Sequence, residues 1–481
     1  MKERRLPENG ENKMRTMPVG KLLFTMALPL ALSMLVQAFY NVVDSYFVSK
    51  VHTDAVTALS FAFPIQNLQI GCATGIAVGM NSLLSKSLGE GNQERANQAA
   101  GNGILLTGVL IAVFMIFGFV GVKPYYSVFG ANEHTTQYGV DYTTICTIFT
   151  LGIFVEILGE RLLQASGRTV YTLFTQGTGA VLNIILDPIF ILGSDGLAQT
   201  MGIRLPFYVP RMEVAGAAIA TVIGQWVAAI MAVIFNLTKN PDVHFSFRYM
   251  KLRKDIVQKI LAVGVPSMIM MAIGSVMNFC MNQIFMGFKD TYGQTPATVF
   301  GIYFRLQSFF LMPLFGINNA SISIVAYNYG ARQPHRITKT LKLGLCTAMV
   351  IMLLGLTVFQ LFPATLMGIF GSAEDAGAAD LVKFGISALQ IVSIHFPIAA
   401  VGIALGASFQ ALGNGIYSTI TSLCRQPVVL VPAAYLLSLT GDVNAVWWSF
   451  PMAEIVSAAL TVIFFARIYR QKVKPMQMEQ A

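Results

Sequence analysis

Long apolar stretches alternate with short polar connections along the whole chain of 481 residues. A helix needs roughly 20 apolar residues to cross a bilayer. Windows of this length predict twelve membrane spans, centred near residues 33, 70, 110, 147, 180, 225, 271, 310, 351, 392, 426 and 456. The pattern therefore predicts an all-α polytopic membrane protein that has no large soluble domain.

The composition supports the same class, because a chain with 55% hydrophobic residues, 11% charged residues and a mean hydropathy of +0.63 does not fold in water at this length. The first apolar stretch is too long for a signal peptide and has no small-residue cleavage site, so we expect it to be a retained span. The 5 cysteines occur without a paired motif, which excludes a disulfide framework or a zinc site. We therefore expect an inner-membrane or plasma-membrane protein.

The basic residues are distributed unequally between the two faces of the predicted membrane protein. Of the 32 Lys and Arg residues, 24 fall on the face that carries both termini and 6 on the opposite face. Positive charge accumulates on the cytoplasmic side of membrane proteins, so both termini are predicted to be cytoplasmic. A nucleic-acid-binding surface would instead form one clustered patch, so the net charge of +9 does not indicate a nucleic-acid partner.

The chain contains a weak internal repeat. Pro29 and Asn41 of the first span align with Pro266 and Asn278 of the seventh, and the segment RLLQASGRTVYTL resembles ASFQALGNGIYST later in the chain. The repeat predicts two six-helix bundles related by pseudo-two-fold symmetry, with an axis along the membrane normal. Transporters built in this way bind substrate between the two halves. The predicted boundaries are an N-terminal bundle at 1–237, a cytoplasmic linker at 238–256 and a C-terminal bundle at 257–481.

Two carboxylates lie inside membrane-length apolar stretches. Asp44 lies in the first span, and Asp187 lies in the fifth with Asn183 one helical turn before it. An isolated charge in hydrocarbon is costly, so such residues usually face a cavity that handles ions or substrates. Together with Thr221 of the sixth span they would provide hard oxygen ligands, which suit a sodium ion or a shared proton. Structural hydrogen bonding between helices is the alternative.

The alignment makes this site one-sided. Asp44 aligns with Met281, and Asn183 and Asp187 align with Val429 and Ala433. A carboxylate needed only for folding each bundle would be expected in both halves. The inequality therefore favours a functional site in the N-terminal half.

Further polar residues in the spans are candidates for substrate contact. Asn41 lies near Asp44, Gln225 lies one turn after Thr221, and Glu156 lies near the end of the fourth span. Ion pairing or extension toward the membrane surface is the expected role of the two arginines inside spans, Arg305 and Arg425.

At this point the chain resembles the multidrug and toxic compound extrusion (MATE) family, specifically its MepA-like branch. The matching segments are LPLALSMLVQAFYNVVDSYFVSKV, SLGEGNQERA, QASGRT, NIILDPIFI, VAGAAIATVIGQ, YNYGARQ and FQALGNG, which together cover nearly the whole chain. The resemblance implies a cation site at Asp44, Asn183, Asp187 and Thr221. In the second half, where some members carry acids, this chain has Asn278, Asn282 and Arg305, so the two asparagines are candidates for substrate binding.

The resemblance implies an antiporter that exports cationic or amphipathic drugs in exchange for protons or sodium ions, as a monomer in the lipid bilayer and without an organic cofactor. One alternative is a lipid-linked oligosaccharide flippase of the same superfamily, which would need a more basic cavity. The other is a membrane-embedded enzyme, for which the sequence has no HExxH, Ser/Lys or paired-acid motif. ATP is not the expected energy source, because a Walker A motif is missing from the sequence.

Overall fold

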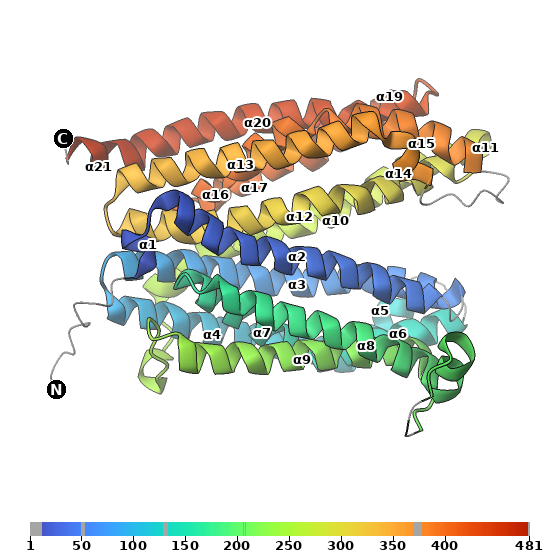
Figure 1. The fold of residues 1–481 in the computed structure, drawn as a ribbon, viewed down its shortest axis with the longest axis horizontal. Coiled ribbons are helices and arrows are strands. Elements are labelled where there is room, and N and C mark those ends of the chain that lie inside the picture. Colours follow the sequence, from blue (N-terminus) through green and yellow to red (C-terminus); the bar gives the residue numbers. More distant parts are fainter. Residues whose placement is uncertain are drawn as a thin grey trace.

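The computed structural model describes residues 12–49, 53–127, 133–204, 206, 208–368 and 378–479. Within these ranges the protein is built from helices and contains no strand. Most of the long helices run along the long axis of the molecule (Figure 1). A helix satisfies its own backbone hydrogen bonds, which is the condition for crossing hydrocarbon.

The helices of the first half carry the residues expected to bind ions. They are α1 (Lys13–Thr16), α2 (Val19–Ser49), α3 (Thr53–Gly89), α4 (Gln93–Ile116), η1 (Phe117–Gly121), α5 (Val122–Ser127), α6 (Glu133–Ile148), α7 (Leu151–Ala165), α8 (Thr169–Met201) and α9 (Glu213–Lys239).

The second half begins after a short helix η2 (Phe247–Tyr249). Its helices are α10 (Lys254–Met286), α11 (Lys289–Tyr292), α12 (Thr295–Gly330), α13 (Pro334–Leu361), α14 (Pro363–Gly368), α15 (Ala378–Ser393), α16 (Phe396–Ala411), α17 (Gly415–Leu423), η3 (Cys424–Leu430), α18 (Val431–Ser438), α19 (Val443–Trp447), α20 (Ser449–Ile468), η4 (Tyr469–Val473) and α21 (Lys474–Met478).

The described helices provide the predicted number of spans. Ten are individually long and apolar enough to cross a membrane, and two bent pairs raise the number to 12 if each pair is one span. The pairs are Glu133–Ile148 with Leu151–Ala165, bent by 47°, and Leu381–Ser393 with Phe396–Ala411, bent by 46°. The two pairs are the fourth and tenth spans, so the same bend recurs at equivalent places in both halves.

The spans gather into two bundles, as predicted. In Figure 1 the helices from α2 to α9 form the lower group, and those from α10 to α21 form the upper group. The two groups lie close together at the end that carries α1 and α21, which we call the terminal end, and diverge toward the other end. The exact boundaries at 237 and 257 stay predictions, although α9 ends at Lys239 and α10 begins at Lys254.

The segment between α9 and α10 docks on α4 through asparagine side chains. Asn97 Oδ1 accepts a hydrogen bond from the backbone N–H of His244 at 2.9 Å, and Asn102 Oδ1 accepts one from the N–H of Arg253 at 3.0 Å. Arg168 forms an ion pair with Asp242 at 3.5 Å. Burial raises the pKa of the Asp242 carboxyl, and the nearby Arg168 opposes this change.

Contacts between the bundles are closest toward the terminal end. An added Cβ on Gly75 of α3 would lie 2.6 Å from the carbonyl oxygen of Gly264 on α10. Gly79 on α3 faces the carbonyl of Ile260 even more closely. Asn81 also donates a hydrogen bond to Ser323 of α12 at 3.2 Å. Small residues thus allow the backbones of the two bundles to touch and close this end.

Candidate functional site

Helices α8 and α9 approach each other closely because glycine lies at their contact. An added Cβ on Gly224 would lie 2.8 Å from the carbonyl oxygen of Gly179. One turn farther along α8, this approach brings Asn183 against Thr221, and Asn183 Nδ2 donates to Thr221 Oγ1 at 3.2 Å. The structure therefore brings together two residues that are 38 positions apart in the sequence.

Asn183 also donates from Nδ2 to Asp187 Oδ1 at 3.2 Å, one helical turn away. Asn183 is 3% exposed and Asp187 is 0% exposed. The carbonyl oxygen Oδ1 of Asn183 is buried and accepts no hydrogen bond from the described residues. We call Asn183, Asp187 and Thr221 the oxygen ledge. A carboxylate, an amide oxygen and a hydroxyl are hard ligands of the kind that a sodium ion or a proton uses.

The other two residues predicted near this site lie on α2. Asp44 and Asn41 belong to this helix, and their side chains lie outside the described residues. The contribution of Asp44 to the oxygen ledge therefore stays a prediction.

Asn183 and Thr221 of the oxygen ledge line a cavity of about 1100 Å³ between the two bundles, and Asp187 lies one helical turn from Asn183, outside this lining. Its walls come from α2, α3, α6, α7, α8 and α9 of the first bundle and from α12 of the second. The lining residues of α3 and α12 come from the parts of these helices away from the terminal end, and the close contacts at Gly75 and Gly79 lie beyond them. The cavity is therefore closed off on the terminal side.

Two predicted substrate residues of the first bundle line this cavity, Glu156 and Gln225. Glu160 lies one turn from Glu156, and its carboxylate accepts hydrogen bonds from Thr175 Oγ1 at 2.7 Å and Gln176 Nε2 at 2.8 Å. Gln176 also lines the cavity. The first bundle thus supplies carboxylate and amide groups to the wall.

Asn278 and Asn282 of α10 are not among the described residues that line the cavity. Asn278 Nδ2 donates to the carbonyl oxygen of Gly274 at 3.1 Å, and Asn282 Nδ2 donates to that of Asn278 at 3.0 Å. Both amides therefore bind the backbone of their own helix. Their role in substrate binding stays a prediction that the geometry does not support.

Arg305 of α12 lines the cavity from the second bundle. Its side chain is exposed, and within the described part of the chain its guanidinium makes no ion pair or hydrogen bond. The other arginine inside a span, Arg425, pairs with Glu454 at 3.6 Å, as expected. The sequence predicted a structural role for both arginines. The structure supports this role for Arg425, which has an ion-pair partner, and does not support it for Arg305.

The second bundle contains a polar network that sequence reasoning did not assemble. His395 Nε2 lies 2.9 Å from the hydroxyl of Tyr303, and His395 Nδ1 lies 3.9 Å from Glu454 Oε2. Glu454 in turn contacts Arg425. The four residues come from α12, the α15–α16 bend, η3 and α20. No local spacing connects them, so only the fold brings them together.

An amide cluster on α3 was also missed, although the sequence contains a signal. Gln66, Asn67 and Gln69 lie within four residues of an otherwise apolar span, and all three line the cavity. Gln66 Nε2 donates to the Tyr142 hydroxyl at 3.0 Å, and Asn67 Nδ2 donates across the bundles to Ser275 Oγ at 3.1 Å. Polar residues clustered in a span indicate a cavity wall, as the carboxylates do.

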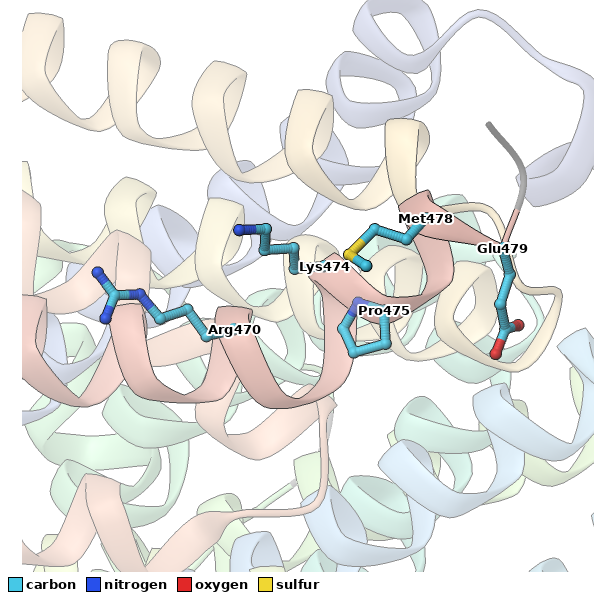
Figure 2. Close-up of a pocket in the computed structure, with 5 residues that line it drawn as sticks. All are labelled: Arg470, Lys474, Pro475, Met478 and Glu479. Atoms are coloured by element: carbon cyan, nitrogen blue, oxygen red, sulfur yellow. The ribbon is translucent and has the colours of Figure 1, made fainter.

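A separate hollow of about 530 Å³ lies along η4 and α21 near the end of the chain, and Figure 2 shows the side chains that line it. Glu479 points away from Arg470 and Lys474 in this view and forms an ion pair with Arg332 at 3.0 Å. All the lining residues come from one short stretch of chain. The arrangement is that of a charged surface at the terminal end, and it is separate from the cavity.

Comparison with known proteins identifies relatives over nearly the whole chain. The MatE family model matches residues 29–189 and 266–436. The two matched segments begin at the two prolines aligned in the internal repeat, Pro29 and Pro266.

Curated relatives are transporters. The chain is 26% identical to a protein of Shewanella oneidensis named FAD transporter, over 91% of this chain and 92% of that protein. It is 23% identical to the Multidrug export protein MepA of Staphylococcus haemolyticus, over 92% of each. A MepA protein of Staphylococcus saprophyticus is also 23% identical, over 93% of this chain and 94% of that protein.

Solved structures share the fold. One, described as a crystal structure of MATE in complex with MaL6, aligns with a TM-score of 0.87 at 22% identity and covers 98% of this chain and 100% of that chain. Another, described as the outward-facing conformation of a multidrug resistance MATE family transporter, aligns with a TM-score of 0.86 at the same identity and coverage. These structures confirm the fold, and the family model together with the curated relatives confirms the expectation of a transporter instead of an enzyme.

Proposed function

We propose, since this chain belongs to the MatE family of membrane transporters, that it is a secondary active antiporter that exports organic cations and other amphipathic drugs in exchange for protons or sodium ions. The observation that carries this proposal is the oxygen ledge, in which Asn183 and Thr221 line the cavity between the bundles and Asn183 connects them to the buried carboxylate of Asp187. Relatives named multidrug export proteins support the substrate class. We further propose that the chain acts as a monomer and needs no organic cofactor.

The coupling step follows from the chemistry of the oxygen ledge. The Oδ1 of Asn183, which accepts no hydrogen bond from the described residues, and the carboxylate of Asp187 would hold the incoming cation, with Thr221 and Asp44 completing the ligand set. A proton or sodium ion bound there cancels the negative charge that attracts a cationic drug. Binding of the ion at the oxygen ledge therefore weakens binding of the drug, and binding of the drug weakens binding of the ion by the same factor.

The direction of transport rests on the charge distribution of the loops. We propose that the terminal end faces the cytoplasm, because that face carries most of the Lys and Arg residues. In that orientation the cavity opens away from the cytoplasm, and the glycine contacts at Gly75 and Gly79 form the cytoplasmic closure. Drug release outward and ion entry from outside would then use the same cavity.

A lipid-linked oligosaccharide flippase is a weaker candidate. Binding a pyrophosphate group favours several basic side chains. Arg305 is the one basic residue among the described residues that line the cavity.

The deciding experiment is ethidium efflux in everted membrane vesicles under separately imposed proton and sodium gradients. We expect one of the two gradients to drive accumulation of the dye, and that result identifies the coupling ion. A heat-inactivated vesicle sample and an empty-vector sample serve as controls. Dependence on ATP with no response to either gradient would refute the antiporter proposal.

The pH dependence of binding provides a second test. A proton on the oxygen ledge opposes a cationic drug, so we expect drug affinity in detergent to rise with pH across the mildly acidic range. The dependence should flatten in Asp187→Asn, which cannot lose a proton. An unchanged slope in both Asp187→Asn and Asp44→Asn would place the coupling group elsewhere, with Glu156 as the next candidate.

A further inference from the structure

The cavity has an acidic residue on one wall and a basic residue on the other. Among its described lining residues, Glu156 on α7 is the acidic one and Arg305 on α12 is the basic one. Glu156 belongs to the first bundle and Arg305 to the second. A cavity that bound only organic cations would gain nothing from an arginine on its wall, because the guanidinium repels a cation and weakens its binding.

The position of Arg305 argues against a purely structural role. It lies ten residues inside α12, or about 15 Å along the helix axis from Thr295. Its guanidinium makes no ion pair or hydrogen bond within the described part of the chain. A charged side chain at membrane depth that lacks a protein partner usually marks a substrate pathway. Arg425, by contrast, is neutralised by Glu454.

We propose that Arg305 binds an acidic group, a carboxylate or a phosphate, on the substrate, so that among cationic and amphipathic aromatic drugs the cavity prefers those that carry an acid beside their basic group. This inference rests on the proposed transport function and names the substrate class of the same cavity. Arginine suits the role because its planar guanidinium binds carboxylate and phosphate with two parallel hydrogen bonds.

The remaining wall fits the rest of such a substrate. Phe63 and Phe304 line the cavity and offer faces for a planar ring. The amide groups of Gln66 and Gln225 also line it and provide both donors and acceptors. Glu156 accommodates a basic group when the compound is zwitterionic. The acid of the substrate is thus directed to the second bundle and its basic part to the first.

The test uses two probes that differ only in the acid: a rhodamine with a free carboxylate and the methyl ester of the same rhodamine. Binding of each is measured by fluorescence in detergent, with the full-length protein. We expect the wild type to bind the free acid more tightly than the ester. Arg305→Gln should weaken binding of the acid by about tenfold or more, the size of a lost charge-assisted hydrogen bond, and leave the ester nearly unchanged.

Two further variants make the result specific. Arg305→Lys keeps the charge and should retain part of the preference for the acid. Arg467→Gln removes an arginine from α20, away from the cavity, and should change neither probe. The proposal is overturned if the wild type binds both probes equally, or if Arg305→Gln weakens both by the same factor.

The binding assay contains no ion gradient, so it separates this inference from the proposed function. A protein that shows the acid preference but fails to transport under any gradient would refute the antiporter and still assign Arg305. A protein that couples efflux of the ester to a gradient but has no acid preference would refute the role of Arg305 and leave the antiporter intact.

Discussion

The two bundles place their buried charges in different ways. In the first bundle, Asn183 and Thr221 border the cavity, and Asp187 lies one turn behind them. In the second bundle, Glu454 lies inside the helices, where it is held by Arg425 at 3.6 Å and lies 3.9 Å from His395. The Asp187 carboxylate thus contacts a residue of the cavity wall, Asn183, whereas the Glu454 carboxylate is paired with a basic side chain, Arg425.

This difference shows what makes a membrane-embedded acid functional. An acid that contacts the wall of a cavity through a neighbouring side chain lies within reach of an ion or a proton that enters the cavity. An acid that is paired with arginine must first break a buried ion pair, which is costly. The presence of a carboxylate in a span is therefore less informative than the groups that surround it.

The largest expected effect follows from Asp187→Asn. The substitution keeps the size of the side chain and removes its charge, so gradient-driven efflux should fall to the background leak while the protein still inserts and folds. Glu454→Gln is the matched control in the other bundle and should retain the ion response. Efflux in vesicles, normalised to the amount of protein, measures both variants. Normal efflux by Asp187→Asn would assign that acid a structural role.

The next effect concerns stability in the second bundle. Arg425→Gln leaves the buried carboxylate of Glu454 without its base and should lower the free energy of unfolding by up to about 3 kcal/mol, since breaking one side of a buried pair costs this much. The side chain of Arg425 is 29% exposed, so solvent reduces the loss. Thermal unfolding in detergent provides the measurement.

A double variant distinguishes this cause from general damage. Arg425→Met combined with Glu454→Gln removes both charges and should recover most of the lost stability. A double variant as unstable as Arg425→Gln would show that the ion pair is not what stabilises this bundle.

The sequence predicted the spans and the pairing of Asn183 with Asp187 because both depend on local patterns, whereas the contact with Thr221 depends on the packing of α8 against α9. Asn183 and Asp187 are four apart on one helix, and apolar stretches of the right length are visible without a structure. The network of Tyr303, His395 and Glu454 could not be predicted, because its members come from distant spans and no spacing connects them. The sequence shows that Arg305 lies inside a span. Only the packing of α12 shows that Arg305 lines the cavity and that its guanidinium has no ion-pair partner among the described residues.

A smaller effect is expected where the bundles meet. Gly79→Ala would place a methyl group against the backbone of α10, so it should destabilise the closed terminal end by about 1–2 kcal/mol, as overpacking does. Gly274→Ala, on α10, meets no atom of the described residues within 4 Å and should instead stabilise the helix by up to about 1 kcal/mol. Thermal unfolding of the two variants tests whether this contact separates the cavity from the terminal end. Equal shifts in both would mean that the backbone contact at Gly79 is not tight.

The smallest effect is expected from Asn282→Ala in the second bundle. The Asn282 amide donates to the backbone of its own helix and is exposed, and it does not belong to the described cavity wall. Drug affinity should therefore change by less than about 0.5 kcal/mol, roughly twofold, the range of surface substitutions. Asn183→Ala, at the oxygen ledge, should lose the ion dependence of binding in the same titration. If Asn282→Ala abolished the ion response and Asn183→Ala preserved it, coupling would belong to the second bundle, and the contrast between the two halves would have to be reversed.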